Sequence, residues 1–557
     1  MKKGLYLLLA PLLVVALALS ACGGNAQEPA VAPTSPATPG DTAPTVPQAV
    51  EQSITFALHS IADSIDPGYT AETYASPILT NIFESLVTYD SNNNLIPGQA
   101  ASWEISDDGL VYTFHLRPNL RWSDGSTLNA YDFVYAWLRV ITPSFGSLFA
   151  DQMLPYVLNA QEFYTGNASA DAVGVKALDD NTLEVTLVAP TPFFLDLCST
   201  YTFSPVQQAT VEANGDKWTL SADSLVCNGP FRVTEVNFNE SYVFEKNPYY
   251  WNADNMKLEH LKFVYISETS TALTAFTAGE IDGFWEVPSS DLARLRAESD
   301  ELIVVNAFGT TFHLLNNTAE PFDNLLVRKA FNLAIDRQAL IEDVLGTNDS
   351  PAYALVAPGY VVNGVDVTAG RSSYELAPKA QPEAAQQALA QAGYPNGEGF
   401  PTITYYYSTN DTYKKTVEAL TAMLESNLNI NIELKTADWA VFYEDVQAGN
   451  YQIAQYGWGG DYLHPMTFLP LIVTTGVNNY SHYSNLDYDA LVAQIQSDTN
   501  EEQAAKLIRQ AEDISMSEYP VLPLFHRSYS YMMRNGTEGY FRTPLNNLYF
   551  RDAYVTN

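Results

Sequence analysis

The stretch IPGQAASWEISDDGLVYTFHLRPNLRWSDGSTLNAYDFVYAW, residues 96–137, decides how the rest of the chain is interpreted. Within it, VYTFHLR (111–117) alternates apolar and polar side chains, which predicts a half-buried strand. The turn WSDG predicts that Gly125 adopts positive φ. Asn129 followed by Asp132 predicts a capping box at the start of a helix. A strand, a turn and a capped helix in succession indicate a mixed α/β protein.

Strand and helix patterns continue through the chain without a regular βαβ period and without an internal repeat. A chain of 557 residues is too long for one core, so two to four domains are expected. Gly393 is placed to end a helix and Asp438 to begin one. Strands are predicted at 53–58, 174–188, 231–246 and 521–534, and helices at 327–345, 382–394, 412–428 and 499–519.

The N-terminus has the pattern of an export signal. Lys2 and Lys3 precede a short apolar run, residues 4–19, that is too short for a comfortable membrane span. The run ends in LSAC, which resembles the bacterial lipobox and implies cleavage before Cys22 and lipidation of that cysteine. An ordinary signal peptide with a chance cysteine is the alternative. We therefore predict a signal peptide at 1–21 and an extracytoplasmic, lipid-anchored protein.

Residues 22–52 are rich in Pro, Ala and Thr and lack apolar periodicity, which predicts a tether. The chain has 27 basic and 64 acidic residues, and a net charge of −37 argues against a nucleic-acid partner. Outside the cytoplasm, Cys198 and Cys227 are predicted to form a disulfide that closes a loop of about thirty residues. Two separate buried thiols are the alternative.

Catalytic motifs are absent from the sequence. The seven histidines form no HExxH or paired-ligand spacing, and no cysteine cluster could hold zinc. No GxSxG elbow, P-loop or GxGxxG stretch occurs. DSNNNLIPG (90–98) lacks the glycine and glutamate of a calcium loop and predicts a turn. We expect no enzyme, metal or cofactor, although a catalytic set could assemble from distant segments.

Five stretches resemble one protein family in the same order. With 96–137, these are NGPFRVTEVNFNESYVFEKNPYYW (228–251), NNTAEPFDNLLVRKAFNLAIDR (316–337), GWGGDY (457–462) and SEYPVLPLFH (517–526). The chain resembles the family 5 extracytoplasmic solute-binding proteins of oligopeptide and dipeptide ABC importers over residues 53–557. The resemblance implies a monomer that delivers ligand to ABC permease and ATPase subunits.

The fold implied by the resemblance is a two-lobed periplasmic-binding-protein-like clamp with an additional third domain, built from mixed sheets flanked by helices. The chain is expected to cross between lobes near 307 and 526, where a hinge would lie. The implied parts are lobe I at 53–82, 190–307 and 527–557, domain II at 83–189, and lobe III at 308–526.

The resemblance also implies an ammonium anchor in GWGGDYLHP (457–465). Peptide-binding members hold the ligand's α-ammonium with an aspartate in such a motif, and Asp461 occupies that position; a turn cap is the alternative. The neighbouring glycines would offer backbone groups to the ligand, and the aromatic side chains would form a wall of the site. The candidate ligand-binding residues are Asp461, Gly457, Trp458, Gly459 and Tyr462, with Tyr69, Thr73 and Tyr74 from the facing lobe as candidates that simple packing would explain equally well.

One departure from the family bears on the ligand. Tripeptide-binding relatives can hold the ligand carboxylate with basic residues, but the aligned positions here are Leu345, Val446 and Gln455. We therefore expect longer or variable-length peptides, or a ligand without a carboxylate. The second hypothesis is an oligosaccharide such as a β-glucan or cello-oligosaccharide, because 35 tyrosines offer stacking faces. An extracytoplasmic hydrolase is a distant third.

Overall fold

The structure is a computed structural model that describes residues 50–60, 62, 64–70, 72, 74–237, 239–498 and 500–556. The predicted signal peptide, Cys22 and residues 23–49 of the tether lie outside the described residues, as does Thr73. Residues 50–557 form one compact unit.

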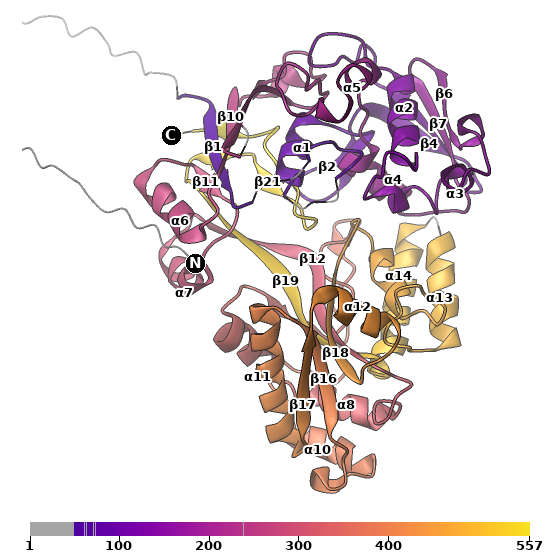
Figure 1. Cartoon of the computed structure of the whole chain (residues 1–557), viewed down its shortest axis with the longest axis vertical. Coiled ribbons are helices and arrows are strands. Elements are labelled where there is room, and N and C mark those ends of the chain that lie inside the picture. Colours follow the sequence, from indigo (N-terminus) through magenta and orange to yellow (C-terminus); the bar gives the residue numbers. More distant parts are fainter. Residues whose placement is uncertain are drawn as a thin grey trace, which may run out of the picture. The chain divides into compact units, whose positions relative to one another are not determined.

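Helices and strands alternate irregularly, as the sequence indicated (Figure 1). The helices are α1 (Ser76–Ile82), α2 (Ala130–Val140), α3 (Ala160–Tyr164), α4 (Phe194–Cys198), α5 (Gln208–Asn214), α6 (Thr269–Ala278), α7 (Ser289–Glu298), α8 (Leu325–Leu333), α9 (Arg337–Ala339), α10 (Pro382–Gln391), α11 (Asp411–Leu428), α12 (Trp439–Gln447), α13 (Leu486–Ser497) and α14 (Glu501–Ser517). The strands are β1 (Ser53–Leu58), β2 (Val87–Tyr89), β3 (Leu95–Pro97), β4 (Ala100–Ile105), β5 (Val111–Leu116), β6 (Val175–Asp179), β7 (Thr182–Thr186), β8 (Phe231–Asn237), β9 (Ser241–Lys246), β10 (His260–Tyr265), β11 (Gly283–Phe284), β12 (Leu302–Leu315), β13 (Ser350–Pro351), β14 (Val361–Val362), β15 (Val365–Asp366), β16 (Ile403–Ser408), β17 (Ile432–Ala437), β18 (Ile453–Gly459), β19 (Val521–Met533), β20 (Thr537–Glu538), β21 (Phe541–Arg542), β22 (Leu548–Tyr549) and β23 (Tyr554–Val555).

Local sequence explains where several helices begin. An asparagine side chain accepts a backbone N–H bond at the start of five helices, and this satisfies donors that have no partner inside the helix. At α2 the predicted capping box of Asn129 and Asp132 is confirmed. Gly125 has a φ of +85°, as the turn required. The other four caps are Asn324 of α8, Asn410 of α11, Asn485 of α13 and Asn500 of α14.

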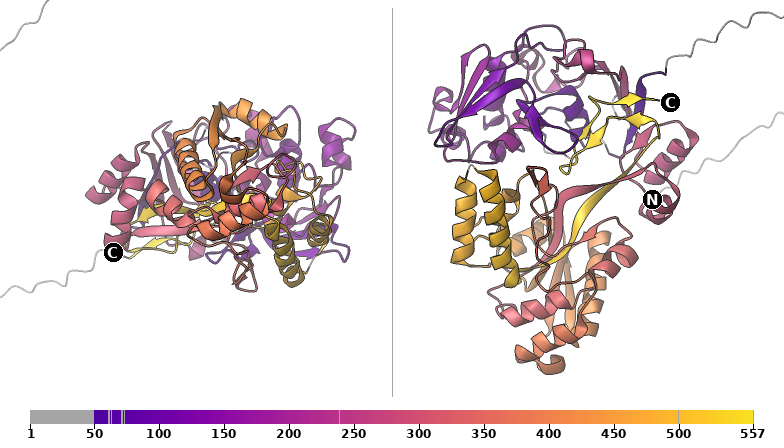
Figure 2. Two further views of the ribbon diagram at one scale, coloured as in Figure 1. Left: turned by 90° about the horizontal axis from the view of Figure 1, so that it is seen from below. Right: turned by 180° about the vertical axis from the view of Figure 1, so that it is seen from behind.

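One eleven-stranded sheet runs through the described unit, in the order β17-β16-β18-β12-β19-β11-β1-β10-β9-β8, with β13 also paired to β19. Its two long central strands, β12 and β19, are antiparallel neighbours and run from the upper to the lower half of the view (Figures 1 and 2). A separate four-stranded sheet, β4-β5-β7-β6, lies in the upper half. Because β12 pairs with β18 on one side and with β19 on the other, all three strands belong to one sheet.

The β12–β19 ladder is interrupted where the sequence predicted the crossing between lobes. Its register shifts between Asn306 and Thr310 and again between Thr311 and Phe312. Such bulges bend a strand and increase its local twist. The shifts lie where residues 306–312 of β12 pair with residues 523–528 of β19. The lobe boundaries themselves stay a prediction.

The C-terminal segment returns to the first helix of the described chain. Asn81 of α1 donates from Nδ2 to the Leu548 carbonyl at 2.7 Å, and its Oδ1 accepts from the Phe550 N–H at 2.8 Å. Arg551 donates to Thr88 Oγ1 at 3.0 Å, beside β2. Buried polar side chains on the first elements are therefore satisfied by the last residues.

Two helix predictions need correction. The helix expected at 327–345 is broken, because α8 ends at Leu333 and Asp336 starts a new one by accepting from the Ala339 N–H at 2.8 Å. The second piece continues as a π-helix, Leu340–Leu345. Asp438 does lie at the start of α12, but its side chain makes no capping bond there.

The predicted disulfide is wrong for this structure, in which Cys198 and Cys227 are free and buried. The two thiols lie in different surroundings. Cys198 ends α4 near the Asp196 carboxyl, whereas Cys227 donates from Sγ to the Phe231 carbonyl at 3.5 Å. The alternative of two separate buried thiols is the one that the structure supports.

The free thiols lead to a simple test. Burial raises the pKa of Cys227 to about 12 and also raises that of Cys198, so the reactive thiolate is scarce at neutral pH. We expect residues 53–557, purified without reductant, to show no rapid reaction with a thiol reagent when native and two reactive thiols after unfolding in urea. If no reactive thiol is detected after unfolding, the two cysteines are bonded and the predicted disulfide is correct.

Candidate ligand site

Asp461 follows the end of β18 and is placed by a tight backbone contact. The Gly460 N–H donates to the Phe308 carbonyl at 2.6 Å, and a Cβ on Gly460 would lie 2.4 Å from the Phe308 ring. Only glycine allows β18 to approach β12 so closely at this point. Of the glycines in GWGGDY, Gly460 therefore serves the close backbone approach that the motif indicated.

The Thr467 hydroxyl organises the residues around Asp461. It accepts from the Trp458 indole N–H at 3.1 Å and from the Asp461 backbone N–H at 3.2 Å, and it donates to Asp461 Oδ2 at 3.3 Å. The following turn, Pro465–Thr467, is capped by His464, whose Nδ1 accepts from the Met466 N–H at 3.2 Å. Capping of that turn is therefore performed by His464 and not by Asp461.

The Asp461 carboxyl has an unusual electrostatic setting. The side chain is open to a cavity, but protein atoms surround it on the other sides, and this burial raises the pKa of the carboxyl to about 6. The charge of Asp151 raises the pKa further, while the Thr467 hydroxyl opposes the shift. Within the residues that the structure describes, no basic side chain forms an ion pair with Asp461. Its charge is available to a cation from outside.

A cavity of about 350 Å³ lies in front of Asp461. Its walls come from segments that are far apart in the sequence. They are Gly459 at the end of β18 with Gly460 and Asp461 after it, Arg527 and Tyr529 on β19, Phe308 on β12, and Ser76, Phe149, Gln152, residues 200–202 and residues 544–547. Most of these groups are aromatic or polar. A small cavity with one unpaired carboxylate, one arginine and aromatic walls suits the charged end of a larger ligand.

The structure places the other predicted residues differently. Trp458 uses its indole N–H within the protein, and Tyr462 is buried and stacks on Phe193 with 4.5 Å between ring centroids. Tyr69 and Tyr74 pack edge-on against Phe145 and His59. None of these four lines the cavity, whereas Gly459 does and Gly457 lies beside the Arg527 guanidinium.

Arg527 is a cavity residue that the sequence analysis missed. The positions compared for carboxylate binding, Leu345, Val446 and Gln455, do not line the cavity, and Val446 and Gln455 are buried. Arg527 comes instead from β19, where its neighbour His526 faces the other side of the strand. The only signal in the sequence was that Arg527 lies in the strand predicted at 521–534, next to the expected crossing between lobes near 526, where side chains alternate between the two faces of the strand.

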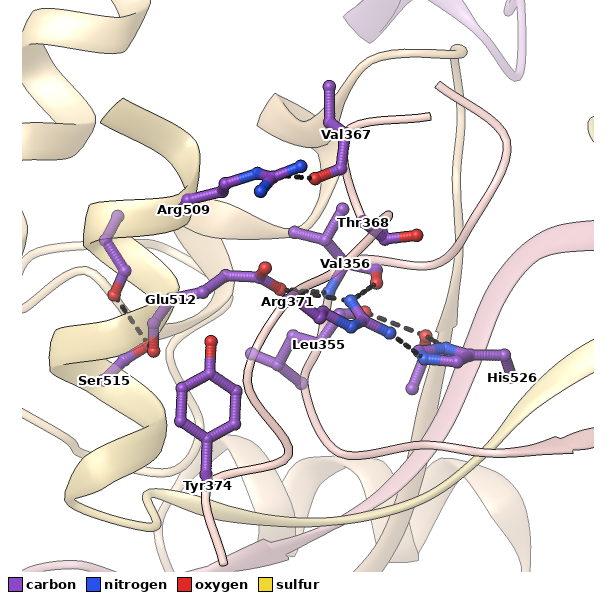
Figure 3. Close-up of polar contacts among 12 residues, drawn as sticks. Leu355, Val356, Val367, Thr368, Arg371, Tyr374, Arg509, Glu512, Ser515 and His526 are labelled. Carbon is purple, nitrogen blue, oxygen red and sulfur yellow. Dashed lines mark hydrogen bonds and ion pairs between the residues drawn. The ribbon is translucent and has the colours of Figure 1, made fainter. Parts of the chain in front are cut away.

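A buried polar cluster lies behind this part of β19 (Figure 3). Arg371 donates to His526 Nε2, so Nδ1 carries the proton and donates to Thr310 Oγ1 at 2.8 Å. The Thr310 hydroxyl in turn donates to the Leu355 carbonyl at 2.8 Å. Arg371 also lies 3.5 Å from the Glu512 carboxyl of α14. The cluster fixes β12 and β19 to α14 at the bulge.

Sequence comparison identifies the family. Residues 94–480 match the family model described as bacterial extracellular solute-binding proteins, family 5, middle region. The chain belongs to this family. Among its family 5 relatives, the oligopeptide-binding protein OppA of Bacillus subtilis is 32% identical over 499 residues, which covers 88% of this chain and 90% of the relative.

Solved structures of family 5 proteins have the same fold. The unliganded open form of the periplasmic murein tripeptide-binding protein MppA matches with a TM-score of 0.80 and 29% identity, over 91% of this chain and 98% of that one. The complex of Haemophilus influenzae OppA with the peptide RPPGFSPFR matches with a TM-score of 0.68 and 31% identity, over 91% and 99%. The expected solute-binding fold is thereby confirmed. Among the described residues, no helix is both long and apolar enough to span a membrane.

Proposed function

We propose that this chain is the substrate-binding lipoprotein of a peptide ABC importer. It captures oligopeptides in an extended conformation between lobe I and lobe III and delivers them to the permease and ATPase subunits. The observation that carries the proposal is the Asp461 carboxyl, which lines a cavity and has no cationic partner among the described residues. Relatives that bind oligopeptides support the same ligand class.

The proposed mechanism separates affinity from sequence selectivity. The ligand's α-ammonium binds Asp461, and strand-like hydrogen bonds to its backbone hold it irrespective of side chains. At about 4 Å and an effective dielectric constant near 20, the raw attraction between ammonium and carboxylate is roughly 4 kcal/mol before desolvation. Ligand contacts from both lobes then favour closure at the β12–β19 bulge.

The described conformation corresponds to the receptor before it closes. Identity and coverage are similar for the two solved structures above, but the TM-score is higher for the unliganded open form than for the peptide complex. We place the lobe boundaries as the resemblance implied: 53–82, 190–307 and 527–557 in lobe I, 83–189 in domain II and 308–526 in lobe III. The protein acts as a monomer, anchored outside the cytoplasm through lipidated Cys22 and the 22–52 tether.

An oligosaccharide remains the second candidate because aromatic rings line the same cavity, namely Phe149, Tyr201, Phe308 and Tyr529. Sugars stack on such faces. A neutral sugar, however, leaves the Asp461 carboxylate without a counter-charge, and that cost favours the peptide.

Calorimetry with acetylated ligands tests the proposal. Residues 53–557 are titrated with peptides of three to nine residues, each paired with its N-acetylated form, and with cello-oligosaccharides. We expect the free-amine peptides to bind and acetylation to weaken binding by at least tenfold, because it removes the ammonium charge. Equal affinity for both forms, or binding of the sugars alone, would contradict the proposal.

A further inference from the structure

Arg527 is the second charged group of the cavity, and its position is built into the sheet. Its Nε donates to Thr311 Oγ1 at 3.1 Å, so the side chain crosses from β19 over the neighbouring strand β12. The guanidinium then reaches Gly457 on β18, which pairs with Thr311. Three adjacent strands of one sheet thus hold this arginine in place.

Gly457 makes room for the guanidinium. A Cβ on Gly457 would lie 2.4 Å from an Arg527 terminal nitrogen. Any larger residue at 457 would displace the guanidinium from the sheet surface. Gly457 was predicted to bind ligand through its backbone, and this contact gives it a different role.

The terminal nitrogens of Arg527 have no carboxylate partner among the residues that the structure describes. Asp349 is a neighbouring anion: burial raises the pKa of this carboxyl, and the Arg527 charge partly offsets the shift. Its oxygens, however, already accept from the Ser528 N–H at 2.7 Å and the Thr347 hydroxyl at 2.8 Å. A cationic fork that is half-buried beside a cavity is therefore free to bind a carboxylate bidentately.

We propose that Arg527 binds a carboxylate of the ligand while Asp461 binds its α-ammonium, so that the site selects a zwitterionic peptide segment. This inference rests on the proposed function and adds the second charge requirement. Arg527 lies against Gly457, four residues before Asp461, and β18 ends between them at Gly459, so the two backbone positions are at most about 13 Å apart. An extended peptide of two to four residues spans about 7–14 Å between its ends.

By the proposed boundaries Asp461 belongs to lobe III and Arg527 begins the last segment of lobe I. The Arg527 side chain is nevertheless held by Thr311 and Gly457, which belong to lobe III, whereas the wall formed by Gln152 and Tyr201 comes from elsewhere in the chain. The carboxylate has two chemical sources. It is either the α-carboxylate of a short peptide or the side chain of an acidic residue within about four positions of the N-terminus of a longer one.

The test compares Arg527→Gln with the wild-type protein and with Lys506→Gln, which removes a positive charge from an exposed position on α14. The short ligands are trialanine, trialanine amide and N-acetyl trialanine. The long ligands are alanine hexapeptides with glutamate or glutamine in third position. Affinities come from calorimetry at pH 7, and thermal melting checks that each variant folds.

In the wild-type protein and in Lys506→Gln we expect at least tenfold tighter binding of the carboxylate ligand in one pair or in both. The short pair is trialanine and trialanine amide, and the long pair is the glutamate and the glutamine hexapeptide. Arg527→Gln should abolish that preference and keep the sensitivity to N-acetylation. The pair that discriminates identifies the source of the carboxylate. No preference in the wild type, or a preference that survives in Arg527→Gln, would overturn this inference, while indifference to acetylation would overturn the proposed function instead.

A second variant tests the geometry. Gly457→Ala should reduce the carboxylate preference by displacing the guanidinium, and it should have no further effect on that preference when combined with Arg527→Gln. A loss of affinity in Gly457→Ala that is equal for trialanine and trialanine amide, with the carboxylate preference intact, would show that Gly457 acts on the ligand independently of Arg527.

Discussion

Replacing Asp461 with asparagine lowers the affinity for a free-amine peptide by about 100-fold, since truncating one member of a desolvated charge pair costs roughly 2–5 kcal/mol. Asparagine keeps the size of the side chain and its bond with Thr467 but removes the charge. The affinity for the N-acetylated peptide should change little. Calorimetry on both proteins with both peptides gives the four constants that isolate the ammonium–carboxylate coupling.

The same interaction predicts a bell-shaped pH dependence. The pKa of Asp461 is raised to about 6, so below that pH the carboxyl must lose a proton before it can bind an ammonium group, and affinity falls. Above about pH 8 the ligand's α-amino group loses its own proton and affinity falls again. We expect the acidic limb to disappear in Asp461→Asn. A wild-type affinity that is constant from pH 5 to pH 7 would show that Asp461 carries no ligand.

The Asp461→Asn variant is expected to fold, so a loss of peptide affinity in this variant reports on binding. The pKa of Asp461 in the folded protein lies above its ordinary value of 3.8, so the ionised carboxyl opposes folding as the pH rises from about 4 to about 6 and above. Water in the cavity screens part of this effect. The unliganded Asp461→Asn protein should therefore melt at the same temperature as the wild type or higher at pH 7.

Arg371→Met has the largest expected effect on stability, a loss of about 3–5 kcal/mol in the free energy of unfolding. Glu512 is buried, and this burial raises the pKa of its carboxyl while the nearby Arg371 guanidinium lowers it. Without Arg371 the carboxylate has no ionic partner in its place, and His526 loses its donor. Urea unfolding at pH 8 and pH 5 measures the effect.

The pH dependence of this loss follows from Glu512. In Arg371→Met the pKa of Glu512 rises further, so the loss of unfolding free energy should be larger at pH 8 than at pH 5, because a carboxyl with a raised pKa takes up a proton more readily as the pH falls. Adding Glu512→Gln should recover part of the loss. The matched control is Arg509→Met, which removes an arginine that is hydrogen-bonded to the carbonyls of Val367 and Ala369 and whose charge lowers the pKa of Glu512 less than that of Arg371 does; it should cost about 1 kcal/mol. An equal loss of unfolding free energy in Arg371→Met and Arg509→Met would show that Arg371→Met does not leave the Glu512 carboxylate buried without an ionic partner.

Local patterns in the sequence predicted most individual elements. The strands 53–58 and 231–246, the capping box at Asn129 and the helix at 412–428 all depend on neighbours within a few residues, and the structure confirms them. The break at Asp336 was missed because apolar spacing continues across it. Periodicity records which face is buried but not whether one helix or two bury it.

The candidate site was predictable only in part. Asp461 could be singled out because its glycines and aromatics adjoin it in sequence. Arg527 depends on Thr311 and Gly457, which are distant in the chain and adjacent only after β12 pairs with both β18 and β19. The Cys198–Cys227 prediction failed because it rested on the extracytoplasmic location and on the number of cysteines, and neither fixes the distance between two thiols in the fold.

The return of the C-terminus to α1 affects when the protein can fold. β1 lies between β10 and β11, and Asn81, which also donates to the Pro77 carbonyl of its own helix, makes its long-range hydrogen bonds with Leu548 and Phe550. The first elements therefore cannot complete their pairing until the last residues have been synthesised. Contacts across so long a chain also slow folding. In a chain that is exported as proposed, this delay keeps the precursor loose enough to pass through a translocation pore, and the finished receptor assembles only on the far side of the membrane.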